Sequence, residues 1–164
     1  MKNSNSKALV ERIRRDTFCT KIAAGVVACV ALIFLVRFIT TIISGNYAQN
    51  DLQGDAANFV RAGCGAAAFV MLSLILSEIC RTGKPFTKGI KKKLENIAWV
   101  LAFSPLAAIF ANTAAAFIDP TATGTQRDIP TVDLLIMIFA VVIGIISEIF
   151  HYGVNLEEDM DSIA

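Results

Sequence analysis

The sequence predicts an all-α polytopic membrane protein with four transmembrane helices, built as two parallel-repeat helical hairpins with both termini in the cytoplasm. Composition is the first reason, since 55% of the residues are hydrophobic, only 18% are charged and the mean hydropathy is +0.60. The second reason is that the charges gather in short stretches between four long apolar runs. This pattern is typical of membrane proteins and not of a soluble core.

The connection after the second apolar run determines the predicted orientation. It holds six basic residues and no acidic one: Arg81, Lys84, Lys88, Lys91, Lys92 and Lys93. The N-terminal segment holds six more Lys or Arg residues, whereas the other two connections hold only Arg127 between them. Short basic segments stay on the cytoplasmic side of a membrane. The bias therefore predicts that both termini and the 80–93 connection are cytoplasmic.

The elements follow in order from the charge and hydropathy pattern. Residues 1–21 form a basic cytoplasmic arm, within which residues 8–17 are expected to form a short helix on anionic headgroups. Residues 22–152 form the four-helix transmembrane domain, and residues 153–164 form an acidic cytoplasmic tail. Each span is long enough to cross about 30 Å of hydrocarbon at about 1.5 Å per residue. The spans are expected at about 22–44, 58–80, 94–118 and 132–150.

Local sequence chemistry predicts a tight turn between the second and third helices. Gly83 suits the C-cap of one helix, and Pro85 beyond it blocks continuation. Thr87 is expected to cap the N-terminus of the next helix. Within that helix, Pro105 should produce a kink.

A short motif recurs with a 70-residue offset. Ser77-Glu78-Ile79 followed by Gly83 matches Ser147-Glu148-Ile149 followed by Gly153. Both copies end even-numbered spans at the cytoplasmic side. The recurrence favours two hairpins in the same orientation, related by an axis along the membrane normal.

Four charged residues within the spans are the candidate intramembrane polar sites: Arg37, Arg61, Glu78 and Glu148. Intramembrane acids often mark an ion or proton path. An interfacial ion pair is the alternative for each glutamate and is favoured, because each lies near a span end with a basic residue three positions later, Arg81 or His151. Arg37 and Arg61 can each extend outward to the membrane surface or pair with an aspartate at the outer face, Asp55 or Asp133, and a structural role is favoured over a substrate site.

The sequence shows no nucleophile with a base, no glycine-rich phosphate loop and no spacing typical of metal ligands. The four cysteines lack a CxxC spacing and are interpreted as reduced, apolar thiols. We therefore expect no enzyme, no cofactor, no metal and no direct contact with nucleic acid.

The cytoplasmic charges are candidate contacts for anionic lipid or for a protein partner. They comprise the six basic residues of the 81–93 segment and three acids of the tail, Glu157, Glu158 and Asp159. The preference of short basic segments for the cytoplasmic side also explains the basic residues without any partner. A solvated chain end likewise explains the acidic residues without a partner.

Three segments, GKPFT (83–87), LENIAWVL (94–101) and GIISEIFHYGVNLEEDMD (144–161), carry a family resemblance. Through them the chain resembles the YoaS-like family of small four-helix bacterial membrane proteins of unknown function. The chain departs from the family pattern in its last four residues. The resemblance implies a place in the bacterial plasma membrane and a cytosolic helix-turn-helix transcription regulator as partner. It implies no activity and no catalytic residues.

Two functions remain open on this basis. The first is an interaction or regulatory protein that binds the cytosolic regulator at its inner face. The second is a small transporter or channel in which Glu78, Glu148 and Arg37 line a shared path. Because four spans enclose little room, the second function requires a homo-oligomer.

Overall fold

Four long helices make up nearly all of the chain that the structure describes. The computed structural model describes residues 2–45, 51–83, 87–118 and 131–163. They fold into α1 (Lys2–Ser44), α2 (Leu52–Thr82), α3 (Lys88–Ile118) and α4 (Thr131–Ile163), with no strand in these ranges. Every helix contains a stretch long and apolar enough to cross a membrane. The prediction of an all-α, four-span protein is confirmed, and the chain is a multi-pass membrane protein.

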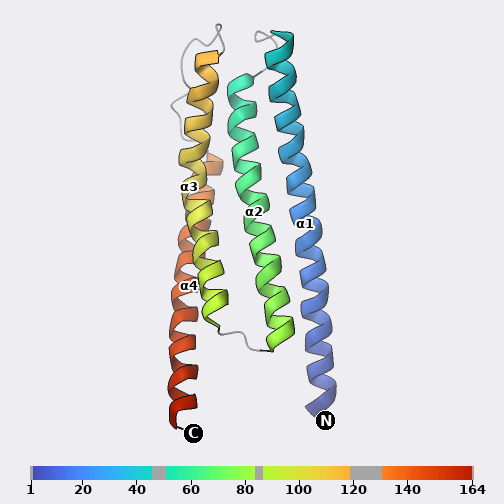
Figure 1. Ribbon diagram of the computed structural model, residues 1–164, viewed down its shortest axis with the longest axis vertical. Coiled ribbons are helices and arrows are strands. Elements are labelled where there is room, and N and C mark those ends of the chain that lie inside the picture. Colours follow the sequence, from blue (N-terminus) through green and yellow to red (C-terminus); the bar gives the residue numbers. More distant parts are fainter. Residues whose placement is uncertain (1, 46–50, 84–86, 119–130, 164) are drawn as a thin grey trace.

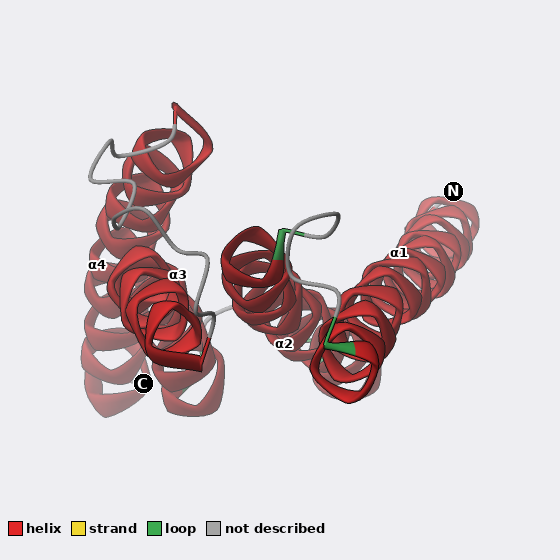
Figure 2. Cartoon of the chain, turned by 90° about the horizontal axis from the view of Figure 1, so that it is seen from above, coloured by secondary structure: helices red, strands yellow, loops and turns green. Residues whose placement is uncertain are grey.

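The helices alternate in direction, so the described ends fall into two groups (Figure 1). The start of α1, the end of α2, the start of α3 and the end of α4 lie together at what we call the terminal end, and the opposite ends form the distal end. Close packing within the described residues joins only consecutive helices, α1 with α2, α2 with α3 and α3 with α4. The bundle is therefore an open row in which α1 and α4 stand apart (Figure 2).

Two small apolar clusters hold the row together. Towards the terminal end, Ile75 of α2 packs against Ile90, Leu94 and Ile97 of α3, and Phe150 of α4 covers this cluster. Towards the distal end, Leu52 and Ala56 of α2 meet Ala115 of α3 and Phe38 of α1. Because α2 and α3 contribute to both clusters, they form the centre of the row.

The outward faces are strongly apolar, as a lipid environment requires. Phe117, Ile43 and Phe110 are 88%, 80% and 74% exposed. Buried positions are often small, and Ala108 and Ala115 of α3 are almost fully covered. Small residues let helix backbones approach closely in lipid, where packing replaces the hydrophobic effect between helices.

Two predicted boundaries differ from the structure. The short surface helix expected at residues 8–17 is instead the first part of α1, which runs without a break from Lys2 to Ser44. The polar connection expected at 45–57 is shorter, because α2 begins at Leu52. Asp51 caps α2 by accepting a hydrogen bond of 2.8 Å from the backbone N–H of Gly54. The sequence prediction did not include this cap and assigned residues 52–57, nearly two helical turns, to the connection. Pro105 lies within α3, and the helix is continuous through it.

Candidate functional site

The turn between α2 and α3 is built as the local sequence predicts. Gly83 adopts a left-handed conformation with φ of 67°, and its N–H donates to the carbonyl of Ile79 at 2.9 Å. Glycine is favoured there because it has no Cβ to clash in this conformation. Thr87 accepts a hydrogen bond of 3.2 Å from the N–H of Ile90, as an N-cap does. Both predicted caps are confirmed.

The Glu78 carboxylate of α2 reaches across to the first turns of α3. It forms an ion pair with the Lys93 ammonium and accepts a hydrogen bond of 3.3 Å from the Thr87 hydroxyl. A negative charge at a helix N-terminus is also favoured by the helix dipole. Within the described residues the ion pair of Glu78 is with Lys93 and not with the expected Arg81, because the chain reverses after Thr82 and Lys93 approaches Glu78 across the helix interface.

Gly89 makes room for this contact. A Cβ at position 89 would lie 2.9 Å from Oε1 of Glu78, too close for the carboxylate to stay in place. The sequence reading missed the role of Gly89 and of Lys93. A glycine within the first turn of a helix, where it weakens helix formation, was the available signal.

At the distal end, Arg61 of α2 binds Asp133 in the first turn of α4. Nε and Nη2 of Arg61 lie 2.6 and 2.8 Å from the two carboxylate oxygens, and Nη1 donates to the side chain of Asn58 at 3.0 Å. The Asp133 side chain is fully buried. The prediction that Arg61 pairs with an outer aspartate is confirmed, with Asp133 as its partner.

Arg37 of α1 pairs with the other predicted aspartate. Its Nε lies 3.3 Å from Oδ2 of Asp55 in the first turn of α2. The Arg37 side chain is 54% exposed, whereas that of Asp55 is 5% exposed. The ion pair predicted for Arg37 is therefore present, and it is looser than the pair between Arg61 and Asp133.

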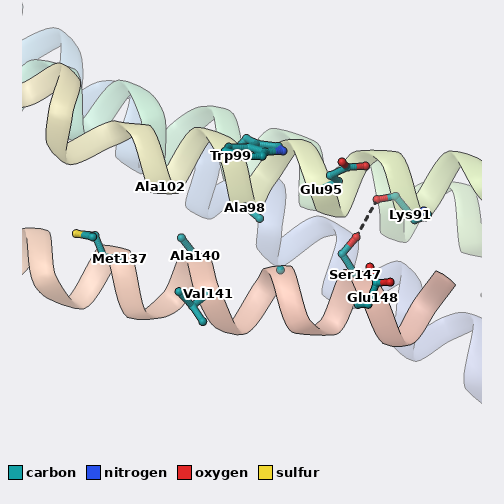
Figure 3. Close-up of a pocket in the computed structure, with 11 residues that line it drawn as sticks. Lys91, Glu95, Ala98, Trp99, Ala102, Met137, Ala140, Val141, Ser147 and Glu148 are labelled. Atoms are coloured by element: carbon teal, nitrogen blue, oxygen red, sulfur yellow. Dashed lines mark hydrogen bonds between the residues drawn. The ribbon is translucent and has the colours of Figure 1, made fainter. Parts of the chain in front are cut away.

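Glu148 lies elsewhere, on the rim of a groove between α3 and α4. The groove has a volume of about 390 Å³, and Lys91 and Glu95 of α3 line it opposite Ser147 and Glu148 of α4 (Figure 3). The Ser147 hydroxyl donates to the backbone carbonyl of Lys91 at 3.4 Å. No ion pair joins Glu148 to His151 within the described residues, so the structure does not support that expectation.

The two glutamates of the repeated motif thus have different surroundings. Ser147 is 5% exposed and bonded to α3, whereas Ser77 is exposed. Glu78 is held by Lys93, while Glu148 opens onto the groove. Arg37 pairs with Asp55 in the first turn of α2, which is at the distal end. The described part of one chain does not bring Glu78, Glu148 and Arg37 to a common cavity.

The remaining predicted contacts lie at the terminal end. Arg81, Lys88 and Lys92 are exposed, and Lys91 is half-buried. Lys84 lies outside the described residues. Glu157, Glu158 and Asp159 belong to the helical backbone of α4, and their side chains also lie outside the described part. Among the described residues, no three metal-binding side chains come together in one group.

Residues 56–163 match DUF2975, a family described as proteins of unknown function. This chain belongs to the DUF2975 family. The match covers the end of the first turn of α2 through α4 and includes Arg61, Glu78, Lys93 and Asp133, while α1 and Arg37 lie outside it. No curated protein matches the chain, and no solved structure does.

Proposed function

We propose that this DUF2975 protein is a membrane-embedded interaction protein that binds a cytosolic transcription regulator at its terminal end. The observation that carries the proposal is that two helices of opposite charge extend beyond the apolar segments on the same side. α1 begins at Lys2, so the basic residues of 2–21 belong to its first part. α4 continues to Ile163 and therefore includes the acidic residues Glu157, Glu158 and Asp159.

The charges support a cytoplasmic position for this end. Basic residues are concentrated in residues 1–21 and 81–93, and short basic segments remain on the cytoplasmic side of a membrane. The YoaS-like resemblance indicates the bacterial plasma membrane. In this orientation the projecting ends of α1 and α4 face the cytosol.

The acidic end of α4 suits a basic partner. Glu157, Glu158, Asp159 and Asp161 lie close together in sequence, after the last apolar run. A DNA-binding regulator presents a basic surface, so this tail offers complementary charge. The helix-turn-helix regulator that the YoaS-like resemblance implies fits this description. On this proposal the protein holds or releases a regulator and catalyses no reaction.

The alternative function, a transporter or channel, gains less support. It requires Glu78, Glu148 and Arg37 to share a polar path, and in the described residues Glu78 is neutralised by Lys93 while Arg37 lies with Asp55 at the other end. An assembly of several chains would have to create the path. Reconstituted vesicles test it directly, because Glu78→Gln and Glu148→Gln should abolish flux in a transporter and leave an interaction protein able to bind.

The proposal is tested by removing only the tail charge. Glu157→Gln, Glu158→Gln and Asp159→Asn together should release the regulator from isolated membranes. The matched control is Glu157→Asp, Glu158→Asp and Asp159→Glu, which keeps the charge and should keep the regulator bound. Equal retention by the neutral and the charged variants would exclude this tail as the contact.

A further inference from the structure

The groove between α3 and α4 has a polar end and an apolar end. Lys91, Glu95, Ser147 and Glu148 line it near the terminal end. Further along, its walls are formed by small residues, Ala98 and Ala102 of α3 and Ala140 and Gly144 of α4, with Met137 at the far limit (Figure 3). A site with this division suits an amphiphile, because a headgroup and a hydrocarbon chain each find matching surroundings.

The length of the groove matches one leaflet of a bilayer. From Lys91 to Ala102 the helix rises about 16 Å at about 1.5 Å per residue, close to half of the roughly 30 Å hydrocarbon thickness. The apolar part lies within the membrane-spanning stretches of α3 and α4. Trp99 is 56% exposed at the side of the groove.

The charges at the polar end are the specific feature. Within the described residues, Lys91, Glu95 and Glu148 form no ion pair, whereas Asp55, Glu78 and Asp133 each do. The residues that line this end of the groove thus include two that carry a carboxylate, which accepts hydrogen bonds, and one that carries an ammonium, which donates them. A ligand that satisfies both kinds of group carries a cation with N–H donors and an anion close together.

We propose that this groove binds a phospholipid with a primary amine headgroup, an ethanolamine phospholipid, from the adjoining leaflet. The lipid ammonium donates hydrogen bonds to Glu95 and Glu148, the phosphate accepts from Lys91, and one acyl chain lies along the small residues between α3 and α4. Charge-assisted hydrogen bonds of this kind are the strong ones. A choline headgroup carries the same charges but has no N–H, and an anionic headgroup would face two carboxylates.

The repeat supplies an internal comparison. The offset of 70 residues that relates Ser77 to Ser147 also relates Lys21 to Lys91, and Lys21 and Ser77 line a cavity of about 300 Å³ together with Thr17, Phe18 and Cys80. The position equivalent to Glu95 is Gly25. Glu78, which is equivalent to Glu148, is bound to Lys93. The α1–α2 cavity therefore has the lysine and the serine but lacks both free carboxylates. It should not distinguish an ethanolamine phospholipid from a choline phospholipid.

The test is lipid retention by the full chain. Protein reconstituted in an equimolar mixture of ethanolamine, choline and glycerol phospholipids with the same acyl chains is extracted in mild detergent, and its bound lipid is measured by native mass spectrometry. We expect the ethanolamine lipid to exceed the choline lipid about tenfold, the ratio that one charge-assisted hydrogen bond supplies. Glu95→Gln with Glu148→Gln should remove the preference.

A second variant tests the position. A Cβ at Gly144 would meet nothing within 4 Å, and Gly144 lines the groove, so Gly144→Leu should place a side chain in the groove and abolish retention. Gly25→Leu is the matched control, since a Cβ there is equally unobstructed and lies outside the groove, and it should retain lipid as wild type does. Equal retention of ethanolamine and choline lipids, preference for the glycerol lipid, or unchanged retention by Gly144→Leu would each overturn the proposal. If Gly144→Leu does not fold, the variant with Glu95→Gln and Glu148→Gln tests the proposal in its place, because both side chains are exposed.

Discussion

Arg61 of α2 holds both carboxylate oxygens of Asp133 across a separation of 72 residues in the chain. The guanidinium supplies a two-point contact and donates a third hydrogen bond to Asn58. This contact fastens the start of α4 to α2, although these two helices are not neighbours in the row. A planar fork that matches a carboxylate is the geometry for which arginine is suited and lysine is not.

Among charge substitutions at the distal end, those that break this pair should lower the free energy of unfolding most. Asp133 is fully buried, so Arg61→Gln leaves a carboxylate without its partner, and we expect a loss of about 3–5 kcal/mol in the free energy of unfolding. Unfolding in detergent micelles with added denaturing detergent measures this. The double variant Arg61→Gln with Asp133→Asn should lose less than the sum of the two single losses. Additive losses would show that the two side chains do not interact.

The same substitution at Arg37 should cost less. Arg37 makes one contact of 3.3 Å and is half exposed, but its partner Asp55 is 5% exposed, so we expect Arg37→Gln to lower the free energy of unfolding by less than Arg61→Gln does without being neutral. Both arginines are tested in the same unfolding assay, which makes each the control for the other. A larger loss at position 37 than at position 61 would contradict the assigned roles.

A side chain at position 89 should disturb the contact between Glu78 and Lys93. In Gly89→Ala the new Cβ would displace the Glu78 carboxylate from Lys93, so the variant should be less stable even though alanine favours helix formation by about 1 kcal/mol over glycine. Gly63→Ala in α2 is the control, because a Cβ there meets nothing within 4 Å. If both variants gain stability alike, the close approach of Glu78 to Gly89 does not occur.

The orientation of the terminal end is open to a direct test. We expect a fluorescent protein fused after Ala164 to be folded and visible in cells, and a phosphatase that is active only outside the cytoplasm to be inactive there. The same pair of reporters placed in the 119–130 connection should give the reverse result. An active phosphatase at the C-terminus would contradict the predicted topology.

Much of the fold could be predicted because the deciding interactions are local. Long apolar runs fix the four helices, and the caps at Gly83 and Thr87 depend only on residues within one turn. The partner of Glu78 could not be found in this way. The rule for neighbours on one helix surface points to Arg81, whereas the turn brings in Lys93 from the next helix.

Contacts between distant segments were predictable only as alternatives. Two arginines and two aspartates at the same membrane depth permit either pairing, and only the packing of the helices assigns Asp55 to Arg37 and Asp133 to Arg61. The groove between α3 and α4 had no counterpart in the sequence reading. It depends on how Ala98 and Gly144 come to face one another across an interface that no local pattern describes.

The central claim, that the terminal end binds a cytosolic regulator, is tested most directly by co-purification from native membranes in mild detergent. The chain is compared with a version shortened after Leu156, which keeps Val154, a residue that is only 4% exposed and belongs to the packed part of α4. We predict that a small basic DNA-binding protein accompanies the full chain in near-equal amount and is lost from the shortened one. Recovery of the membrane protein without such a partner, or equal recovery of the partner with both versions, would contradict the account.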